Sequence, residues 1–185
     1  MARLVHLNGP PGIGKSTLAA LYVERHPGTL NLDVDAVHRL VGGWQDEDNR
    51  TWDVVWPLVR AMAATQLAGG RDVVLPQYLA RLDEITTLEE LARGQGAGFV
   101  EIVLLDDRQA SIERFAHRAR DDDDPWVRHH QRFVEQRGGT AFLGSMYDDL
   151  LEVLRQRPLA VVVPSTAGAV RETYDRLATV LHNGG

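Results

Sequence analysis

Residues 9–17 read Gly-Pro-Pro-Gly-Ile-Gly-Lys-Ser-Thr, the most specific pattern in the chain. Its first eight residues match G-x-x-x-x-G-K-[ST], the pattern of a phosphate-binding loop. The apolar-rich residues 3–8 before it predict a buried strand, and residues 15–25 after it predict a helix. Strand, glycine-rich loop and helix in this order are the context that the motif requires, and a chance glycine-rich turn does not explain that context. The sequence therefore predicts a nucleoside triphosphate site.

The residue types of the loop suit polyphosphate chemistry. Its glycines let the backbone point successive N–H groups at an anion, and the amino end of the following helix adds positive potential. We expect Lys15 to reach the β- and γ-phosphates and Ser16 to ligate the Mg²⁺ that accompanies ATP. The predicted ATP-binding loop consists of Gly9, Pro10, Pro11, Gly12, Ile13, Gly14, Lys15, Ser16 and Thr17.

Length and composition limit the class of protein. The chain has 185 residues, of which 44% are hydrophobic and 25% charged, as expected for one globular domain over 1–185. It contains no cysteine, which excludes disulfides and suits a reducing cytoplasm. No apolar run approaches the roughly 20 residues that span a bilayer, and no signal-peptide pattern is visible. The net charge of −6 disfavours a large nonspecific nucleic-acid surface, so nucleic acid is the less favoured partner. We expect a cytoplasmic protein whose oligomeric state the sequence does not indicate.

Short apolar runs alternate with helical segments along the chain. Predicted strands cover 4–8, 30–34, 72–75, 99–105 and 159–163, and predicted helices cover 15–25, 35–41, 51–68, 83–93, 109–120, 125–136, 141–155 and 169–182. The strands lack strict alternation, which is typical of parallel strands covered on both faces. The prediction is an α/β fold with helices on both sides of a parallel sheet.

An acidic run, Asp121 to Asp124, precedes Pro125. We interpret it as a solvated turn in which Asp124 caps a helix that begins at Pro125. The alternative is metal binding, but four carboxylates beside ATP phosphates would repel the substrate.

Two aspartates, Asp33 and Asp35, follow the second predicted strand, where ligands bind in open parallel sheets. Spaced two residues apart on an extended segment, both are expected to face the crevice that holds the phosphates. We assign Asp35 the role of the base that orients and deprotonates an acceptor hydroxyl, and Asp33 a place near the metal. The alternative for Asp35 is a helix cap at Ala36.

Four segments together resemble the P-loop kinases of the nucleoside monophosphate kinase-like group. They are GPPGIGKST at 9–17, LDVDAVHR at 32–39, ERFAHRAR at 113–120 and VVVPSTAG at 161–168. The members most similar in layout are chloramphenicol phosphotransferase, adenylylsulfate kinase, gluconate kinase and the kinase domain of polynucleotide kinase. The resemblance spans most of the chain, with a highly specific loop motif and less specific remaining segments.

This resemblance implies a three-layer fold with a five-stranded parallel sheet of order 2-3-1-4-5 and a mobile helical lid, roughly residues 114–139. It implies that Asp35 matches the catalytic aspartate of the group. Arg39 stands where relatives carry a substrate-contacting arginine, unless it is an ordinary helix-surface residue. Ser165 and Thr166 fall in the segment that contacts adenine.

The third predicted strand departs from many P-loop NTPases, because Val73-Val74-Leu75 runs into Pro76-Gln77 instead of an aspartate. This weakens an interpretation as a motor, a GTPase or an AAA-type ATPase, which need a carboxylate for Mg²⁺ and water. It places three candidate substrate-binding residues at the crevice: Gln77, Tyr78 and Arg81. Arg81 has the alternative of being a plain surface residue.

Arginines and tryptophans supply the remaining candidates. Arg118 and Arg120 are expected to stabilise the transferring phosphoryl group, and Arg114 to lie near adenine. The alternative is an amphipathic helix whose arginines face water. Trp44 is a candidate for stacking on an aromatic or sugar acceptor, whereas Trp52 and Trp56 share a helix face and suit core packing.

The sequence thus predicts an enzyme that transfers phosphate from ATP, with Mg²⁺, to a hydroxyl of a small molecule. Two alternatives stay open at this point. One is a kinase of polynucleotide 5′ ends, and the other is a regulatory protein that binds a nucleotide without transferring phosphate.

Overall fold

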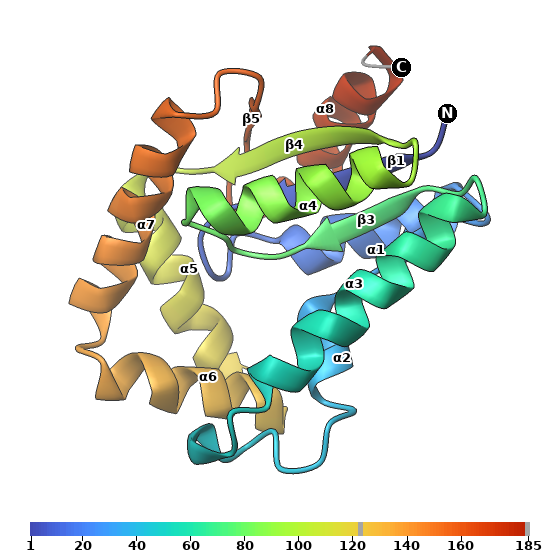
Figure 1. The fold of residues 1–185 in the computed structure, drawn as a ribbon. Coiled ribbons are helices and arrows are strands. Elements are labelled where there is room, and N and C mark those ends of the chain that lie inside the picture. The colour runs from blue at the N-terminus through green and yellow to red at the C-terminus, as the bar shows by residue number, and fades with distance from the viewer. Residues whose placement is uncertain (122–123, 184–185) are drawn as a thin grey trace.

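A computed structural model describes residues 1–121 and 124–183, except the side chains of Glu47, of residues 118–121 and of Asn183. Figure 1 shows its elements. The strands are β1 (Arg3–Asn8), β2 (Leu30–Asn31), β3 (Val73–Pro76), β4 (Gly98–Leu105) and β5 (Val161–Pro164). The helices are α1 (Lys15–Arg25), α2 (Val34–His38), η1 (Glu47–Asn49), α3 (Trp52–Ala68), α4 (Leu82–Gly94), α5 (Arg108–Asp121), α6 (Pro125–Gln136), α7 (Thr140–Arg155) and α8 (Val170–Asn183).

The strands form one five-stranded parallel sheet of order β2-β3-β1-β4-β5, which confirms the predicted topology. β1 lies at its centre, with Leu4 opposite Val73 on one side and Arg3 opposite Gly98 on the other. All carboxyl ends therefore meet at the same edge of the sheet. The phosphate-binding loop, which follows β1, lies at this edge together with the segments that follow β2 and β3.

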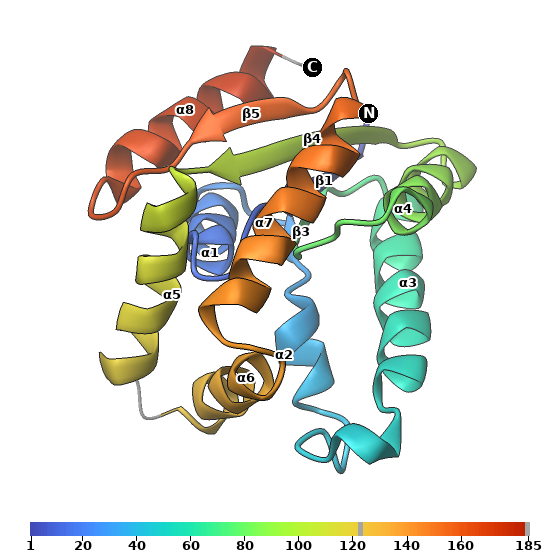
Figure 2. The same cartoon turned by 90° about the vertical axis from the view of Figure 1, so that its left-hand side faces the viewer.

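Helices cover both faces of the sheet, as the continuous apolar strands predict (Figures 1 and 2). Alternate residues of β1 point to opposite faces: Leu4 packs with α3, α4 and α7, and Val5 packs with α1 and α8. A third, smaller cluster joins Ile112 of α5, Val134 of α6 and Leu143 of α7. These helices extend beyond the carboxyl edge of the sheet (Figure 2). The structure thus confirms the predicted three-layer α/β fold.

The predicted boundaries lie within two residues of the observed ones except around β2, and the short helix η1 was not predicted. The predicted strand 30–34 ends at Asn31, and the predicted helix 35–41 covers Val34–His38 instead. The reason is Asp33, whose Oδ1 accepts the N–H groups of Asp35 and Ala36 over 3.0 and 3.2 Å and so begins the helix early. The expectation that both aspartates lie on one extended segment was wrong.

The acidic run behaves as predicted where the structure describes it. Oδ1 of Asp124 accepts the main-chain N–H of Trp126 over 2.8 Å, and α6 begins at Pro125. Residues 122 and 123 lie outside the described part. Among the described residues, no helix is both long and apolar enough to cross a membrane.

Candidate active site

The phosphate-binding loop has the backbone that the motif predicts. Gly12 and Gly14 have φ values of 79° and 105°, in the left-handed region that favours glycine. Within the described residues, the main-chain N–H groups of these two glycines donate to no acceptor in the protein. Helix α1 begins directly afterwards, without a side-chain cap and without an acidic residue in its first turn. The loop therefore presents N–H donors and the positive end of a helix to an anion.

Lys15 lies across the loop that precedes it. Its Nζ donates to the main-chain oxygens of Gly9 and Pro10 over 2.8 and 3.0 Å. These contacts hold the ammonium group beside the loop, where a bound phosphate would replace the carbonyl oxygens as its partner. The neighbouring Ser16 and Thr17 are exposed, so their hydroxyl groups are accessible to a nucleotide.

Arg114 supports the loop from α5. Its guanidinium donates to the main-chain oxygens of Ile13 and Ser165 and pairs with Asp106 at 3.3 Å. The buried Ser165 adds a second support, because its hydroxyl donates to the oxygen of Ile13 over 3.0 Å. In this structure both residues hold the loop, and their predicted contacts with ATP stay predictions. The adjacent Thr166 is exposed.

Sequence reasoning missed Asn8, the last residue of β1. Its fully buried side chain accepts the N–H groups of Gly9 and Leu79 over 2.8 and 3.0 Å and donates to the oxygen of Leu79 over 2.8 Å. It thereby joins the start of the loop to the segment after β3. A signal existed in its position, since a polar residue at the buried end of a strand needs such partners.

Asp35 lies in the first turn of α2, beyond the carboxyl end of β2. Its main-chain N–H is held by Asp33, so Asp33 and not Asp35 is the cap of this helix, and the alternative role considered for Asp35 is wrong. Oδ2 of Asp35 accepts the indole N–H of Trp126 over 3.3 Å. The candidate base is therefore connected to α6.

Aromatic rings fill the junction between α2, α6 and the loop before η1. The ring of Trp126 lies 5.0 Å from that of Trp44 and 5.3 Å from that of His38. Burial and the charge of His129 lower the pKa of His38, whose Nε2 lies 2.6 Å from the hydroxyl of Thr51. Trp44 thus packs inside the protein junction, and its predicted contact with an acceptor stays a prediction.

Arg39 also reaches α6, through an ion pair with Asp124 at 3.0 Å. Of the two helical tryptophans, Trp56 packs on the core as predicted, whereas Trp52 is 37% exposed and lies against His38.

The three predicted substrate-binding residues after β3 contact different parts of the protein. The main-chain oxygen of Gln77 contacts Nε2 of His6 at 3.0 Å, and its side chain is half-buried. Tyr78 donates its hydroxyl to the oxygen of Met146 on α7 over 2.9 Å, and burial raises the pKa of this tyrosine. Arg81 is exposed and pairs with Asp83 at 2.7 Å, as a surface residue would. The side chains of Arg118 and Arg120 lie outside the described residues.

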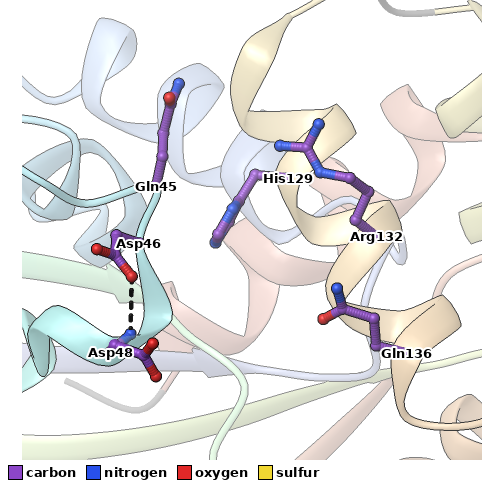
Figure 3. A pocket seen from close by; sticks show the side chains of 6 residues that line it. All are labelled: Gln45, Asp46, Asp48, His129, Arg132 and Gln136. Atoms are coloured by element: carbon purple, nitrogen blue, oxygen red, sulfur yellow. Dashed lines mark hydrogen bonds between the residues drawn. The ribbon is translucent and has the colours of Figure 1, made fainter.

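A cavity of about 360 Å³ opens between the loop at η1 and helix α6. Figure 3 shows side chains of both elements facing each other across it. It combines carboxylates, a guanidinium, an imidazole and amides, and its lining residues are Gln45, Asp46, Asp48, His129, Arg132 and Gln136. Because both charge signs are present, the cavity suits a polar molecule better than a polyanion.

The residues present fit ATP and Mg²⁺. The donors of the loop and Lys15 match a polyphosphate, and the exposed Ser16 offers the hard oxygen ligand that Mg²⁺ prefers. The described residues contain no group of three or more histidines or carboxylates that could hold a metal by itself. Mg²⁺ would therefore share its coordination with the phosphates of the nucleotide.

Comparison with known proteins agrees with this geometry. A family described as an AAA domain matches residues 4–141. An adenylate kinase of Synechococcus sp. (strain CC9311) is 30% identical over 189 residues, which cover 97% of this chain and 98% of the relative. The chain therefore belongs to this AAA domain family and is a P-loop kinase.

Solved structures of this P-loop kinase fold extend the comparison. A gluconokinase from Sinorhizobium meliloti 1021 is similar with a TM-score of 0.60 and 22% identity, over 100% of this chain and 97% of the other. The Pnkp1/Rnl/Hen1 RNA repair complex contains a chain similar with a TM-score of 0.67 and 15% identity, over 84% of this chain and 46% of the other. At these identities the likeness concerns the fold.

The family name does not give this P-loop kinase the chemistry of an AAA-type ATPase. β3 ends at Pro76, and Gln77 follows where such an ATPase needs a carboxylate.

Proposed function

We propose that this P-loop kinase transfers the γ-phosphate of ATP to a hydroxyl group of a small-molecule acceptor, with Asp35 as the general base. The position of Asp35 carries the proposal. It follows β2, and β3 alone separates β2 from the strand that leads into the phosphate-binding loop. Since neighbouring strands lie about 5 Å apart, roughly 10 Å separates the two strand ends. We place the transferring phosphoryl group and the acceptor hydroxyl between the loop and the Asp35 carboxylate.

Each group has a role in this proposal. Lys15 and the loop N–H groups hold the β- and γ-phosphates, and Ser16 ligates Mg²⁺. When bound, Mg²⁺ supplies positive charge that offsets the charge developing on the phosphates. Arg118 or Arg120, from the lid that we propose at roughly 114–139, stabilises the transferring phosphoryl group. Oδ1 of Asp33 caps α2, so only its other oxygen is available to a metal-bound water.

A second candidate acceptor is a nucleoside monophosphate, which the 30% identical adenylate kinase favours. Its phosphate is already an anion at neutral pH and needs no base. A carboxylate at the position of Asp35 would repel such an acceptor, whereas it would orient and deprotonate a hydroxyl. The mixed charges of the cavity at α6 also favour a polar acceptor over a second polyanion. We therefore prefer the hydroxyl acceptor.

Incubation with γ-labelled ATP, Mg²⁺ and a panel of acceptors tests the proposal. The panel contains sugar acids, nucleosides, hydroxylated antibiotics, a 5′-hydroxyl oligonucleotide and nucleoside monophosphates. We expect transfer to one hydroxyl class, and a decrease of about 10²-fold or more in kcat for Asp35→Asn with ATP binding unchanged. The matched control is Asp53→Asn, at an exposed aspartate that pairs with Arg50.

Each other result selects a different function. Transfer to nucleoside monophosphates that Asp35→Asn does not slow would replace the proposal with the second candidate. Transfer to the oligonucleotide alone would indicate a polynucleotide kinase. ATP binding without transfer to any acceptor would indicate a regulatory protein.

A further inference from the structure

Trp126 donates its indole N–H to the carboxylate that we propose as the base. The bond joins residues 91 positions apart, with 3.3 Å between Nε1 and Oδ2 of Asp35. The side chain of Trp126 is only 6% exposed, so little water competes for the indole donor. Through this bond, helix α6 reaches the Asp35 carboxylate.

The surroundings of Trp126 fix the direction of its N–H. The carboxylate of Asp124 holds its main-chain N–H over 2.8 Å, which sets the start of α6. The rings of Trp44, at 5.0 Å, and His130, at 4.4 Å, both pack against the indole. A ring confined in this way presents its donor in one direction.

A second polar contact joins the same two helices. Arg39, at the carboxyl end of α2, pairs with Asp124, which directly precedes α6. α2 is therefore attached to the amino end of α6 at both of its ends, through Asp35 and through Arg39. The exposed ion pair contributes little stability, but together with the indole contact it fixes how the two helices meet.

We infer that Trp126 is a positioning residue for Asp35. A carboxylate rotates about its last side-chain bond, and a donor fixed to one oxygen sets the plane in which both oxygens lie. A base must meet the acceptor hydroxyl in a narrow geometry, so a fixed plane favours proton transfer. The inference rests on the proposed function of Asp35.

The location of Trp126 has a consequence for the order of events. α6 belongs to the segment that we propose as the lid, whereas Asp35 belongs to the body of the protein at the edge of the sheet. The hydrogen bond from Trp126 forms only while α6 rests on α2. Contact between α6 and α2 therefore links the position of the proposed lid to the orientation of the base.

The variant Trp126→Phe removes the N–H and keeps an aromatic ring. With the acceptor found in the panel, we expect kcat to fall about tenfold, as loss of one hydrogen bond to a charged group implies, while KM for ATP stays within about twofold. The acidic limb of the kcat–pH profile should move to higher pH, because the N–H favours the charged carboxylate. The matched control is Trp52→Phe. The ring of Trp52 belongs to the same aromatic cluster, 4.1 Å from that of His38, and its replacement should leave kcat and the kcat–pH profile unchanged.

A second measurement needs no acceptor. The indole N–H signal of Trp126 is assigned in an NMR spectrum by its loss in Trp126→Phe, and we expect it to shift at pH 7 in Asp35→Asn relative to wild type. An unmoved signal overturns the inference. The inference is also overturned if Trp126→Phe keeps the kcat and pH profile of the wild type while Asp35→Asn is inactive. Full activity of Asp35→Asn instead overturns the proposed function, so the two failures are distinguishable.

Discussion

The guanidinium of Arg114 donates to the main-chain oxygen of Ile13 over 2.9 Å, across 101 residues of sequence. This bond joins α5, the helix that leads towards α6, to the middle of the phosphate-binding loop. The other terminal nitrogen of the same guanidinium donates to the Asp106 carboxylate and to the main-chain oxygen of Ser165. The shape of the loop therefore depends on residues that its own sequence motif does not include.

Substitution Arg114→Ala should weaken ATP binding without preventing folding. It removes the donor to Ile13 and leaves the half-buried Asp106 without its ion pair, which should cost about 1–3 kcal/mol of unfolding free energy. We expect Kd for ATP, measured by calorimetry, to rise about tenfold because the loop loses its support. The control Arg155→Ala, at an exposed arginine that pairs with Glu152 on the same helix, should change neither quantity. An unchanged Kd in Arg114→Ala would mean that the loop keeps its shape without this arginine.

Substitution Gly12→Ala should impair ATP binding more than its backbone strain alone explains. A Cβ at this position would lie 3.0 Å from Cα of Phe115, which is backbone of α5 and cannot move aside cheaply. Gly96→Ala is the matched control, because Gly96 also has a positive φ, 66°, but a Cβ there meets nothing within 4 Å. Both variants should lose about 1–2 kcal/mol from the left-handed backbone, measured by urea unfolding. Only Gly12→Ala should also lose ATP affinity, and equal affinities in both variants would contradict this.

Substitution Arg157→Met should destabilise the fold most at neutral pH. Arg157 pairs with Glu101 on β4 at 2.7 Å and with Glu89 on α4 at 2.8 Å, and Glu101 is only 5% exposed. Burial raises the pKa of Glu101, and Arg157 partly offsets this effect. Removal of the arginine leaves a buried charge, which should cost about 3–5 kcal/mol at pH 7.

This loss should shrink as the pH falls. A carboxyl whose pKa is raised on folding binds a proton more readily in the folded state, so the cost of its charge shrinks as the pH falls through the raised pKa and is gone below the pKa of the unfolded chain. Urea unfolding of wild type and Arg157→Met at pH 7 and pH 5 measures the difference. A loss of stability that is equal at both pH values would contradict the role of Glu101.

His6 should make the protein less stable in weak acid. It is fully buried in β1, and burial lowers its pKa to about 4 from 6.5. Between these values the unfolded chain binds a proton that the folded chain does not, so stability falls by about 1.4 kcal/mol per pH unit as the pH decreases. The slope of unfolding free energy against pH should flatten in His6→Gln but not in His182→Gln, at an exposed histidine. Equal slopes in the two variants would exclude His6 as the cause.

The fold could be predicted from local sequence, because each strand of the sheet is a short apolar run and the longer helices occupy the segments between these runs. β2 was the exception, because the capping side chain of Asp33 ends the extended segment earlier than its apolar pattern suggests. Asp124 caps α6 through the N–H of Trp126, two residues further along the chain, so its capping role was readable in sequence.

The contacts that complete the site were not readable in this way. The Trp126 bond to Asp35 joins positions 91 residues apart, and the side chain of Asn8 reaches Leu79 across 71 residues. No periodicity or short motif relates such positions, since only the crossing of helices beyond the sheet brings them together. A tryptophan on an amphipathic helix is more often a core residue than a donor to a carboxylate, so its role needed the structure.

The central position of β1 has a consequence for how the chain acquires its structure during synthesis. This apolar strand is made first, yet its partners begin at Val73 and Gly98. At about 5–20 residues per second, the ribosome needs roughly 3–13 s to add the 64 residues between the end of β1 and the start of β3. During that interval β1 has an unpaired edge on both sides. Nascent chains of this protein should therefore be clients of chaperones that bind short apolar segments, and the requirement should end once β4 has left the ribosome.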